Sequence, residues 1–285
     1  MISYDFEYYL PLSIKEAVQL FEELQGKGKD PIYFSGGTEI ITLGRLNAVK
    51  TGAVIDIKQI PDCQVFKLEQ GFLITGAANT LTSVEEENMF PLLSATVSEI
   101  ADRTARNKIT VGGNVCGQIF YREAVLPFLL TDSVMVIAGS KGIRDVSINE
   151  IFEQRLLLEP GEFLVQIKTE GKFLHQPFVS IKRRRQWKTG YPLITVAALQ
   201  VNGTIRIAIS GLTTYPFRST QMEEILSNNK LPLVKRIEQA INILDVPALD
   251  DSEGSFRYRL FVLKNTLQDV FHQIEREEPN RDCYL

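Results

Sequence analysis

The sequence predicts an α+β protein built in two parts, and two observations lead to this class. Short apolar strands alternate with helical patterns up to about residue 170, and longer β-rich runs followed by helical patterns take over after that point. A length of 285 residues is comfortable for two domains. We therefore expect domains at 1–170 and 171–285, with the break between Gly161 and Gln176 and Gly171-Lys172 as its expected position.

The first part should begin with a helix. Ser13 and Glu16 form a capping box, and apolar residues follow at helical spacing up to Gly26. Further along, Glu69-Gln70-Gly71 separates two apolar runs and indicates a hairpin. In chain order we expect a helix at 13–26, a strand at 31–35, a helix at 39–46, a strand at 53–57, a hairpin of 65–68 with 72–75, a helix at 91–101, a hairpin of 134–138 with 144–147, and a strand at 162–165.

The second part should contain an antiparallel sheet backed by helices. Strands are predicted at 178–182, 193–201 and 204–210, and Asn202-Gly203 between the last two is typical of a type I′ hairpin turn. Helical patterns then occupy 222–226, 234–244 and 256–274.

Charge and composition exclude several classes of function. The net charge is −4 and the pI is about 5.5, so nothing favours binding to nucleic acid or to an anionic membrane. Within the four-residue basic run at 182–185, Arg183 to Arg185 are better interpreted as a solvated strand end, with alternate residues facing water, than as a polyanion site. The N-terminus lacks the pattern of a secretory signal and no apolar run is long enough for a membrane span, so a cytoplasmic location is expected.

Cysteine and histidine are too scarce for several kinds of centre. The chain has three cysteines, whereas an ordinary iron–sulfur cluster takes four cysteine thiolates. The two histidines lie far apart in sequence, which argues against a zinc site and a histidine-centred catalytic group. We therefore expect no metal ligands and no catalytic side chain. Cys116 is expected to be a small buried residue, and Trp187 and Tyr191 are expected in the core or at an interface.

Two glycine pairs are the sharpest feature of the sequence. Ser35-Gly36-Gly37-Thr38-Glu39 and Thr110-Val111-Gly112-Gly113-Asn114 each read as a strand that enters a Gly-Gly turn. Glycine accepts positive φ, and successive N–H groups in such a turn can cradle an anion, more strongly where a helix begins directly afterwards. A lone Gly-Gly pair after a strand is usually a tight turn without a ligand, so these residues by themselves indicate no more than a candidate phosphate cradle. Neither fits the glycine spacing of the dinucleotide fingerprint, so a Rossmann fold is not supported.

The glycine pairs and their flanks resemble a known family. The segments 34–41 and 106–117, followed by 147–152, 162–165, 182–185 and 191–198, resemble the FAD-binding subunits of molybdenum hydroxylases of the xanthine dehydrogenase and carbon monoxide dehydrogenase type. The resemblance covers essentially the whole chain. It implies FAD as cofactor, held by a two-lobed FAD-binding domain of the vanillyl-alcohol-oxidase/MurB-like type, with a smaller α+β domain after it.

The resemblance also implies which residues hold FAD. The first loop would wrap the pyrophosphate and the second would run along the flavin, with Lys182 near the isoalloxazine end. Glu123 stands where the family usually has an aspartate, and the segment 186–190 lacks an acidic residue that the family often has there. The implied cofactor-binding residues are Tyr33, Phe34, Ser35, Gly36, Gly37, Thr38, Glu39, Ile40, Ile100, Thr110, Val111, Gly112, Gly113, Asn114, Glu123, Leu164 and Lys182.

Three functions are compatible with these residues. The resemblance implies an oxidoreductase subunit that takes electrons from iron–sulfur clusters of a partner subunit and passes them through FAD to NAD⁺ or another acceptor. A third subunit would hold the molybdenum cofactor, with purine (xanthine) oxidation as one option for the complex. The alternatives are a self-contained flavin-dependent oxidoreductase and a non-catalytic scaffold that has lost its flavin.

Overall fold

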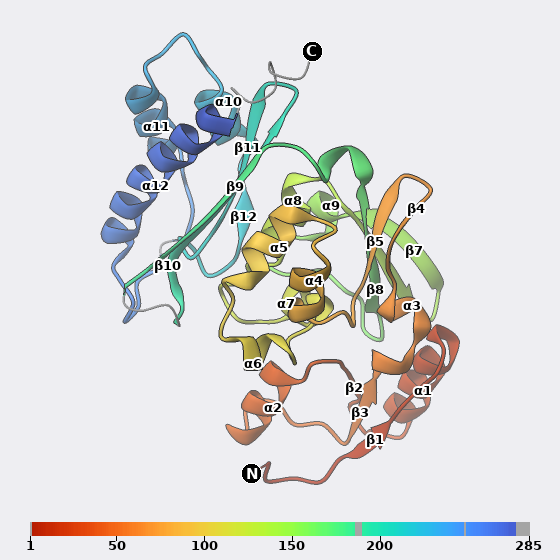
Figure 1. Cartoon of the computed structure of the whole chain (residues 1–285). Coiled ribbons are helices and arrows are strands. Elements are labelled where there is room, and N and C mark those ends of the chain that lie inside the picture. Colours follow the sequence, from red (N-terminus) through yellow and green to blue (C-terminus); the bar gives the residue numbers. More distant parts are fainter. Residues whose placement is uncertain (1, 186–189, 248, 278–285) are drawn as a thin grey trace. The chain divides into compact units, whose positions relative to one another are not determined.

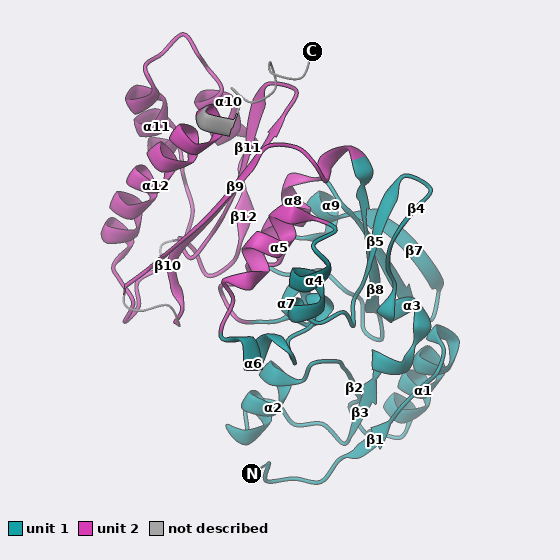
Figure 2. Ribbon diagram, viewed as in Figure 1, with its two compact units in different colours: residues 1–89, 102–118, 132–171 teal, residues 90–101, 119–131, 172–285 magenta. Residues whose placement is uncertain are grey.

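A computed structural model describes residues 2–185, 190–247 and 249–277 (Figure 1). The chain divides into two compact units, which Figure 2 distinguishes by colour. Unit 1 comprises residues 1–89, 102–118 and 132–171, and unit 2 comprises residues 90–101, 119–131 and 172–285. Among the described helices, none is long and apolar enough to cross a membrane.

Unit 1 contains a small parallel sheet near the N-terminus. Its strands are β1 (Glu7–Tyr9), β2 (Ile32–Phe34) and β3 (Ala53–Asp56), in the order β1-β3-β2, and all four residues of β3 are buried. Helix α1 (Ile14–Gly26) leads from β1 to β2, and α2 (Thr38–Arg45) follows β2. The Ser13 hydroxyl accepts the Glu16 N–H, which confirms the predicted start of α1, and the Glu16 carboxylate reaches back to the Leu12 N–H.

A five-stranded antiparallel sheet forms the rest of the framework of unit 1. Its order is β4-β5-β8-β6-β7, and the pairs β4·β5 and β6·β7 confirm both predicted hairpins. Gln70 and Gly71 adopt positive φ in the first of these turns. The strands are β4 (Phe66–Glu69), β5 (Phe72–Gly76), β6 (Val134–Gly139), β7 (Gly142–Ser147) and β8 (Phe163–Glu170). The short helical elements of unit 1 are η1 (Ile57–Gln59), α3 (Pro61–Gln64), α4 (Leu81–Glu87), α6 (Arg103–Arg106), α7 (Val111–Cys116) and α9 (Ile148–Ile151). The short 3-10 helix η2 (Gly171–Phe173) begins at Gly171, the last residue of unit 1.

Unit 2 is an antiparallel sheet with helices on both faces. The order is β12-β11-β10-β9, and Asn202 and Gly203 both have positive φ, as the predicted type I′ turn requires. Strand β10 is buried at eight consecutive positions, 192–199, because α12 packs on one face and α8 on the other. The strands are β9 (Phe178–Arg184), β10 (Pro192–Val201), β11 (Thr204–Ser210) and β12 (Phe217–Arg218); the helices are α5 (Pro91–Ser98), α8 (Val125–Leu130), α10 (Thr220–Leu226), α11 (Leu233–Asn242) and α12 (Phe256–Glu277).

Candidate functional site

The first glycine loop of unit 1 joins strand β2 to helix α2, as predicted. Gly37 has a φ of 72° and is the N-cap of α2, with no side chain that caps the helix. The first N–H groups of a helix have no acceptor within the helix. The start of α2 therefore presents N–H donors and the positive end of the helix dipole, a combination that suits an anion.

Both glycines of this loop are also required by their surroundings. A Cβ on Gly36 would lie 2.0 Å from the carbonyl oxygen of Lys108, and a Cβ on Gly37 would lie 2.3 Å from the Phe34 ring. The packing of the loop thus demands glycine even before a ligand is considered. The first loop is therefore a tight turn that its packing requires, and it also presents the helix start that suits an anion.

The second glycine pair is not a strand-to-turn connection, and that prediction was wrong. Helix α6 precedes it, Thr110 makes only an isolated bridge with Thr80, and 111–116 form the short helix α7. The Thr110 hydroxyl accepts the Gly113 N–H at 3.1 Å and thereby caps the helix. This N-cap threonine starts a helix where glycines at positive φ were expected.

The two glycines of α7 face different surroundings. The Gly112 N–H donates to the Ala77 carbonyl at 2.8 Å, and a Cβ on Gly112 would lie 2.5 Å from the Ala77 Cβ. Gly113 is exposed, and a Cβ there would meet only the Thr110 hydroxyl, at 2.9 Å. Gly112 is therefore a packing position, whereas Gly113 is exposed to solvent and lies against the hydroxyl that caps the helix.

The two loops lie side by side within unit 1. A Cβ on Gly36 would come within 3.2 Å of the Thr110 nitrogen. Both carboxylate oxygens of Glu39 accept the N–H of Gln118, at 2.9 and 3.0 Å, and so tie the first turn of α2 to the chain after α7. The structure thus brings together the predicted residues 33–40 and 110–114.

Tyr33 and Leu164, also predicted to hold the cofactor, belong to the packing of unit 1. The Tyr33 ring stacks on Phe21 at 5.1 Å, and its hydroxyl donates to the Gly161 carbonyl at 3.0 Å. Burial raises the pKa of Tyr33. Leu164 lies in β8 and is 3% exposed.

A polar cluster that the sequence interpretation missed stands at the end of the parallel sheet. Asp56 ends β3, is fully buried, and accepts hydrogen bonds from the Tyr8 hydroxyl and the Lys58 ammonium. Burial, together with the hydrogen bond to Asp56, raises the pKa of Tyr8 to about 12. Asp56 was the available signal, because a carboxylate that ends an apolar strand is rarely buried without partners.

In unit 2 the structure brings two predicted residues into one buried ion pair. Lys182 Nζ lies 2.5 Å from Glu123 Oε1 and also donates to the Glu99 carbonyl at 2.8 Å. The Thr195 hydroxyl donates to the same Glu123 oxygen at 3.3 Å. The two side chains are 3% and 5% exposed, and the pair carries no net charge. The third predicted residue of this unit, Ile100, is 6% exposed.

The strand end at 183–185 has alternate residues facing water, as expected: Arg183 and Arg185 are exposed and Arg184 is half-buried. Arg183 and Arg184 form ion pairs with Asp269 and Glu99. The expectation for Tyr191 needs correction. Tyr191 is not a core residue: it is 54% exposed and stacks on Tyr121, with ring centres 4.9 Å apart.

Cys116 is exposed rather than buried. It is the last residue of α7, and the buried positions of that short helix are 111, 112, 114 and 115. Trp187 lies outside the described residues.

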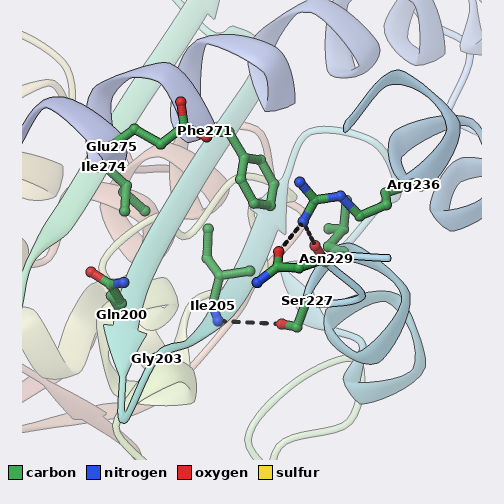
Figure 3. Close-up of a pocket in the computed structure, with 10 residues that line it drawn as sticks. Gln200, Gly203, Ile205, Ser227, Asn229, Arg236, Phe271, Ile274 and Glu275 are labelled. Carbon is green, nitrogen blue, oxygen red and sulfur yellow. Dashed lines mark hydrogen bonds between the residues drawn. The ribbon is translucent and has the colours of Figure 1, made fainter. Parts of the chain in front are cut away.

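A hollow of about 190 Å³ in unit 2 does not suit a dinucleotide (Figure 3). Sites for drug-sized ligands start at about 300 Å³. The Arg236 guanidinium is already engaged there by the Leu226 carbonyl and the Asn229 side chain. Leu226 is the last residue of α10, and Glu275 belongs to the last turn of α12, so negative helix ends and a carboxylate surround the hollow. These groups would disfavour a pyrophosphate.

Comparison with known proteins identifies the family. Residues 4–169, more than half of the chain, match the model of the FAD-binding domain in molybdopterin dehydrogenase. The chain belongs to this family of flavoproteins, and its cofactor is FAD.

Individual relatives agree with this assignment. The chain is 22% identical to the nicotinate dehydrogenase FAD-subunit of Eubacterium barkeri over 95% of both chains. It is 28% identical to the xanthine dehydrogenase FAD-binding subunit of Escherichia coli O157:H7 over 57% of each. A chain of carbon monoxide dehydrogenase from Hydrogenophaga pseudoflava matches the fold with a TM-score of 0.86 at 23% identity, covering 97% of this chain and 99% of that one. This likeness confirms the predicted fold class.

The first loop fits the anionic part of FAD. The Ser35 hydroxyl is buried and has no hydrogen-bond partner among the described residues. Ser35 lies two residues before Gly37, the N-cap of α2. A buried hydroxyl without a partner costs free energy, which a hydrogen-bond acceptor at this position would recover. The Ser35 hydroxyl and the first N–H groups of α2 can all donate hydrogen bonds, as an anionic pyrophosphate requires.

Proposed function

We propose that this chain is the FAD-binding electron-transfer subunit of a molybdenum hydroxylase complex. FAD would receive electrons from iron–sulfur clusters on a partner subunit and deliver them to NAD⁺ or another acceptor. The observation that carries the proposal is the side-by-side placement of the two glycine segments inside a family domain that spans 4–169, with a Ser35 hydroxyl that has no partner among the described residues.

The roles proposed for the side chains are binding and orientation. Residues 33–40 would hold the pyrophosphate through N–H groups and the Ser35 hydroxyl, and residues 110–114 would follow the flavin. The remaining proposed contacts are Ile100, Glu123, Leu164 and Lys182. FAD supplies the electron-transfer chemistry when bound, so no side chain of this chain has to act as an acid or a base.

The other redox centres would belong to partner subunits. Three cysteines cannot supply the four thiolates of an ordinary iron–sulfur cluster. We therefore propose two partners, an iron–sulfur subunit and a subunit that holds the molybdenum cofactor, in a cytoplasmic complex. The names of the two relatives support an N-heterocyclic substrate for the complex, with xanthine as one option.

The proposal is tested by separating flavin chemistry from substrate hydroxylation. The purified chain, reconstituted with FAD, should show the spectrum of an oxidised flavin and should transfer electrons from NADH to an artificial dye. It should not oxidise xanthine, nicotinate or simple aldehydes, whereas the complex purified from the native host should oxidise one of them. The variant Gly113→Val, prepared in parallel, controls for dye reduction that does not depend on bound FAD.

Each part of the proposal can fail separately. A chain that stays colourless with excess FAD would refute flavin binding. Robust substrate oxidation by the isolated chain would refute the subunit role in favour of a self-contained flavoenzyme. Flavin binding without any NADH–dye activity would refute NAD⁺ as the acceptor and leave the electron-transfer role with another acceptor.

A further inference from the structure

The polar cluster at the end of β3 connects a buried carboxylate to the first glycine loop. Asp56 is 0% exposed, and Oδ1 accepts the Lys58 N–H at 2.9 Å. Its other oxygen, Oδ2, accepts from the Tyr8 hydroxyl and from Lys58 Nζ, the latter at 2.5 Å. These donors satisfy the carboxylate and fix the direction of the Lys58 side chain.

Lys58 extends this cluster to the loop itself. Its ammonium donates to the Ser35 carbonyl at 2.9 Å and stands 4.8 Å from the centre of the Phe34 ring. The same ring occupies the space where a Cβ on Gly37 would lie. Lys58 thus contacts the residues on which the conformation of the loop depends.

The hydrogen bond to Ser35 has a directional consequence. The C=O and N–H of one trans peptide point in opposite directions. Because Lys58 holds the Ser35 carbonyl, the Gly36 N–H is directed to the other side of the loop. Asp56 neutralises the Lys58 cation, so the pair orients the peptide rather than adding a net charge that would attract phosphate.

We propose that Asp56 and Lys58 are positioning residues for the cofactor: they hold the first glycine loop in the conformation that receives the FAD pyrophosphate. This inference rests on the proposed function, because it assumes that this loop binds FAD. It assigns a role to two side chains that lie outside the glycine motifs.

The test compares FAD binding by the wild type, Lys58→Met, Lys58→Arg and Lys67→Met in the full chain. Methionine keeps an apolar stem beside Phe34 and removes the donor, whereas arginine restores a cationic donor. Lys67 is the matched control, because it is an exposed lysine of unit 1 that forms an ion pair with Glu69 on the same strand. The readouts are the FAD dissociation constant from flavin fluorescence, the visible spectrum of the FAD-saturated protein, and the melting temperature of the apoprotein.

Lys58→Met should weaken FAD binding by about ten- to a hundredfold, the range expected for one charged hydrogen bond. Its FAD-saturated spectrum should stay close to that of the wild type, whereas its apoprotein melting temperature should fall, because the buried Asp56 carboxylate loses its cationic partner. Lys58→Arg should recover most of the affinity and of the melting temperature, and Lys67→Met should match the wild type. Because FAD affinity is measured on folded apoprotein, below the melting transition of every variant, this combination would separate positioning of the loop from general support of the fold.

Other outcomes would overturn the inference. Wild-type affinity in Lys58→Met, or no recovery in Lys58→Arg, would show that the contact with Ser35 does not position the loop. If Lys58→Met gives no folded apoprotein, Lys58→Gln replaces it; failure of both while Lys67→Met folds would show a purely structural role. A wild type that does not bind FAD would instead refute the proposed function.

Discussion

Replacement of Gly37 by alanine tests whether the first loop needs glycine for its backbone, for space, or for both. Gly37 has a φ of 72°, a conformation that costs a residue with a Cβ about 1–2 kcal/mol. The new Cβ would also lie 2.3 Å from the Phe34 ring, and such overpacking typically costs about 1–3 kcal/mol. We therefore expect Gly37→Ala to lower the free energy of unfolding by about 2–5 kcal/mol.

Gly28 supplies a matched control for the backbone term. It has a φ of 69°, and a Cβ there would find nothing within 4 Å. Gly28→Ala should therefore cost only the backbone strain of about 1–2 kcal/mol. The difference between the two variants, about 1–3 kcal/mol, measures the contact with Phe34.

The assay is thermal unfolding of the apoprotein, followed by circular dichroism, with urea unfolding as a second measure. A loss of 1 kcal/mol shifts the melting temperature by about 2–4 °C for chains of 150–250 residues, so Gly37→Ala should melt roughly 4–20 °C lower. Adding Phe34→Leu should recover part of that loss. Equal melting temperatures for Gly37→Ala and Gly28→Ala would refute the steric argument.

Three further predictions concern the second loop and unit 2. Gly113→Val should abolish FAD binding, and it should also lower the apoprotein melting temperature, because the new Cβ would lie 2.9 Å from the Thr110 hydroxyl that caps α7. A folded apoprotein with wild-type affinity would remove the second loop from the site, and Gly26→Ala is the control, because a Cβ there meets nothing within 4 Å among the described residues. Burial, aided by Asp251, raises the pKa of Tyr121 to about 12. Because the neutral phenol is the form favoured in the folded protein, its contribution of about 2 kcal/mol should be present below pH 10 and lost between about pH 10 and 12; Tyr121→Phe should make that part of the stability curve shallower, and the remaining slope includes the contributions of Tyr8 and Tyr33. Arg259→Leu should destabilise the protein by about 3–5 kcal/mol in urea unfolding, because the fully buried guanidinium donates to four backbone carbonyls and to the Asp251 carboxylate; a loss below 1 kcal/mol would show that these bonds contribute little.

The elements that local patterns specify were predicted well. The capping box at Ser13 starts α1, and Asn202-Gly203 forms the turn between β10 and β11. The two hairpins of unit 1 pair as expected. In each case the signal lies within a few neighbouring residues, so it does not depend on distant parts of the chain.

The candidate site was predicted in its glycine segments but not in its supporting contacts. Lys58 and Asp56 meet the first loop only because β3 lies beside β2 in the parallel sheet. Cys116 was placed wrongly because its exposure depends on how the short helix α7 is buried. Lys182 and Glu123 are far apart in sequence, and their pairing appears only in the folded unit.

The sequence by itself determined the class of fold, most elements, the two glycine segments and the family that they resemble. The tertiary structure alone decided which surface each apolar element covers. The segments 90–101 and 119–131 come from the middle of the first part, yet they belong to unit 2, where α5 and α8 pack against the later sheet. Apolar periodicity shows that a helix must bury one face, but the hydrophobic effect is non-directional and does not name the partner. That choice depends on contacts between residues far apart in the chain.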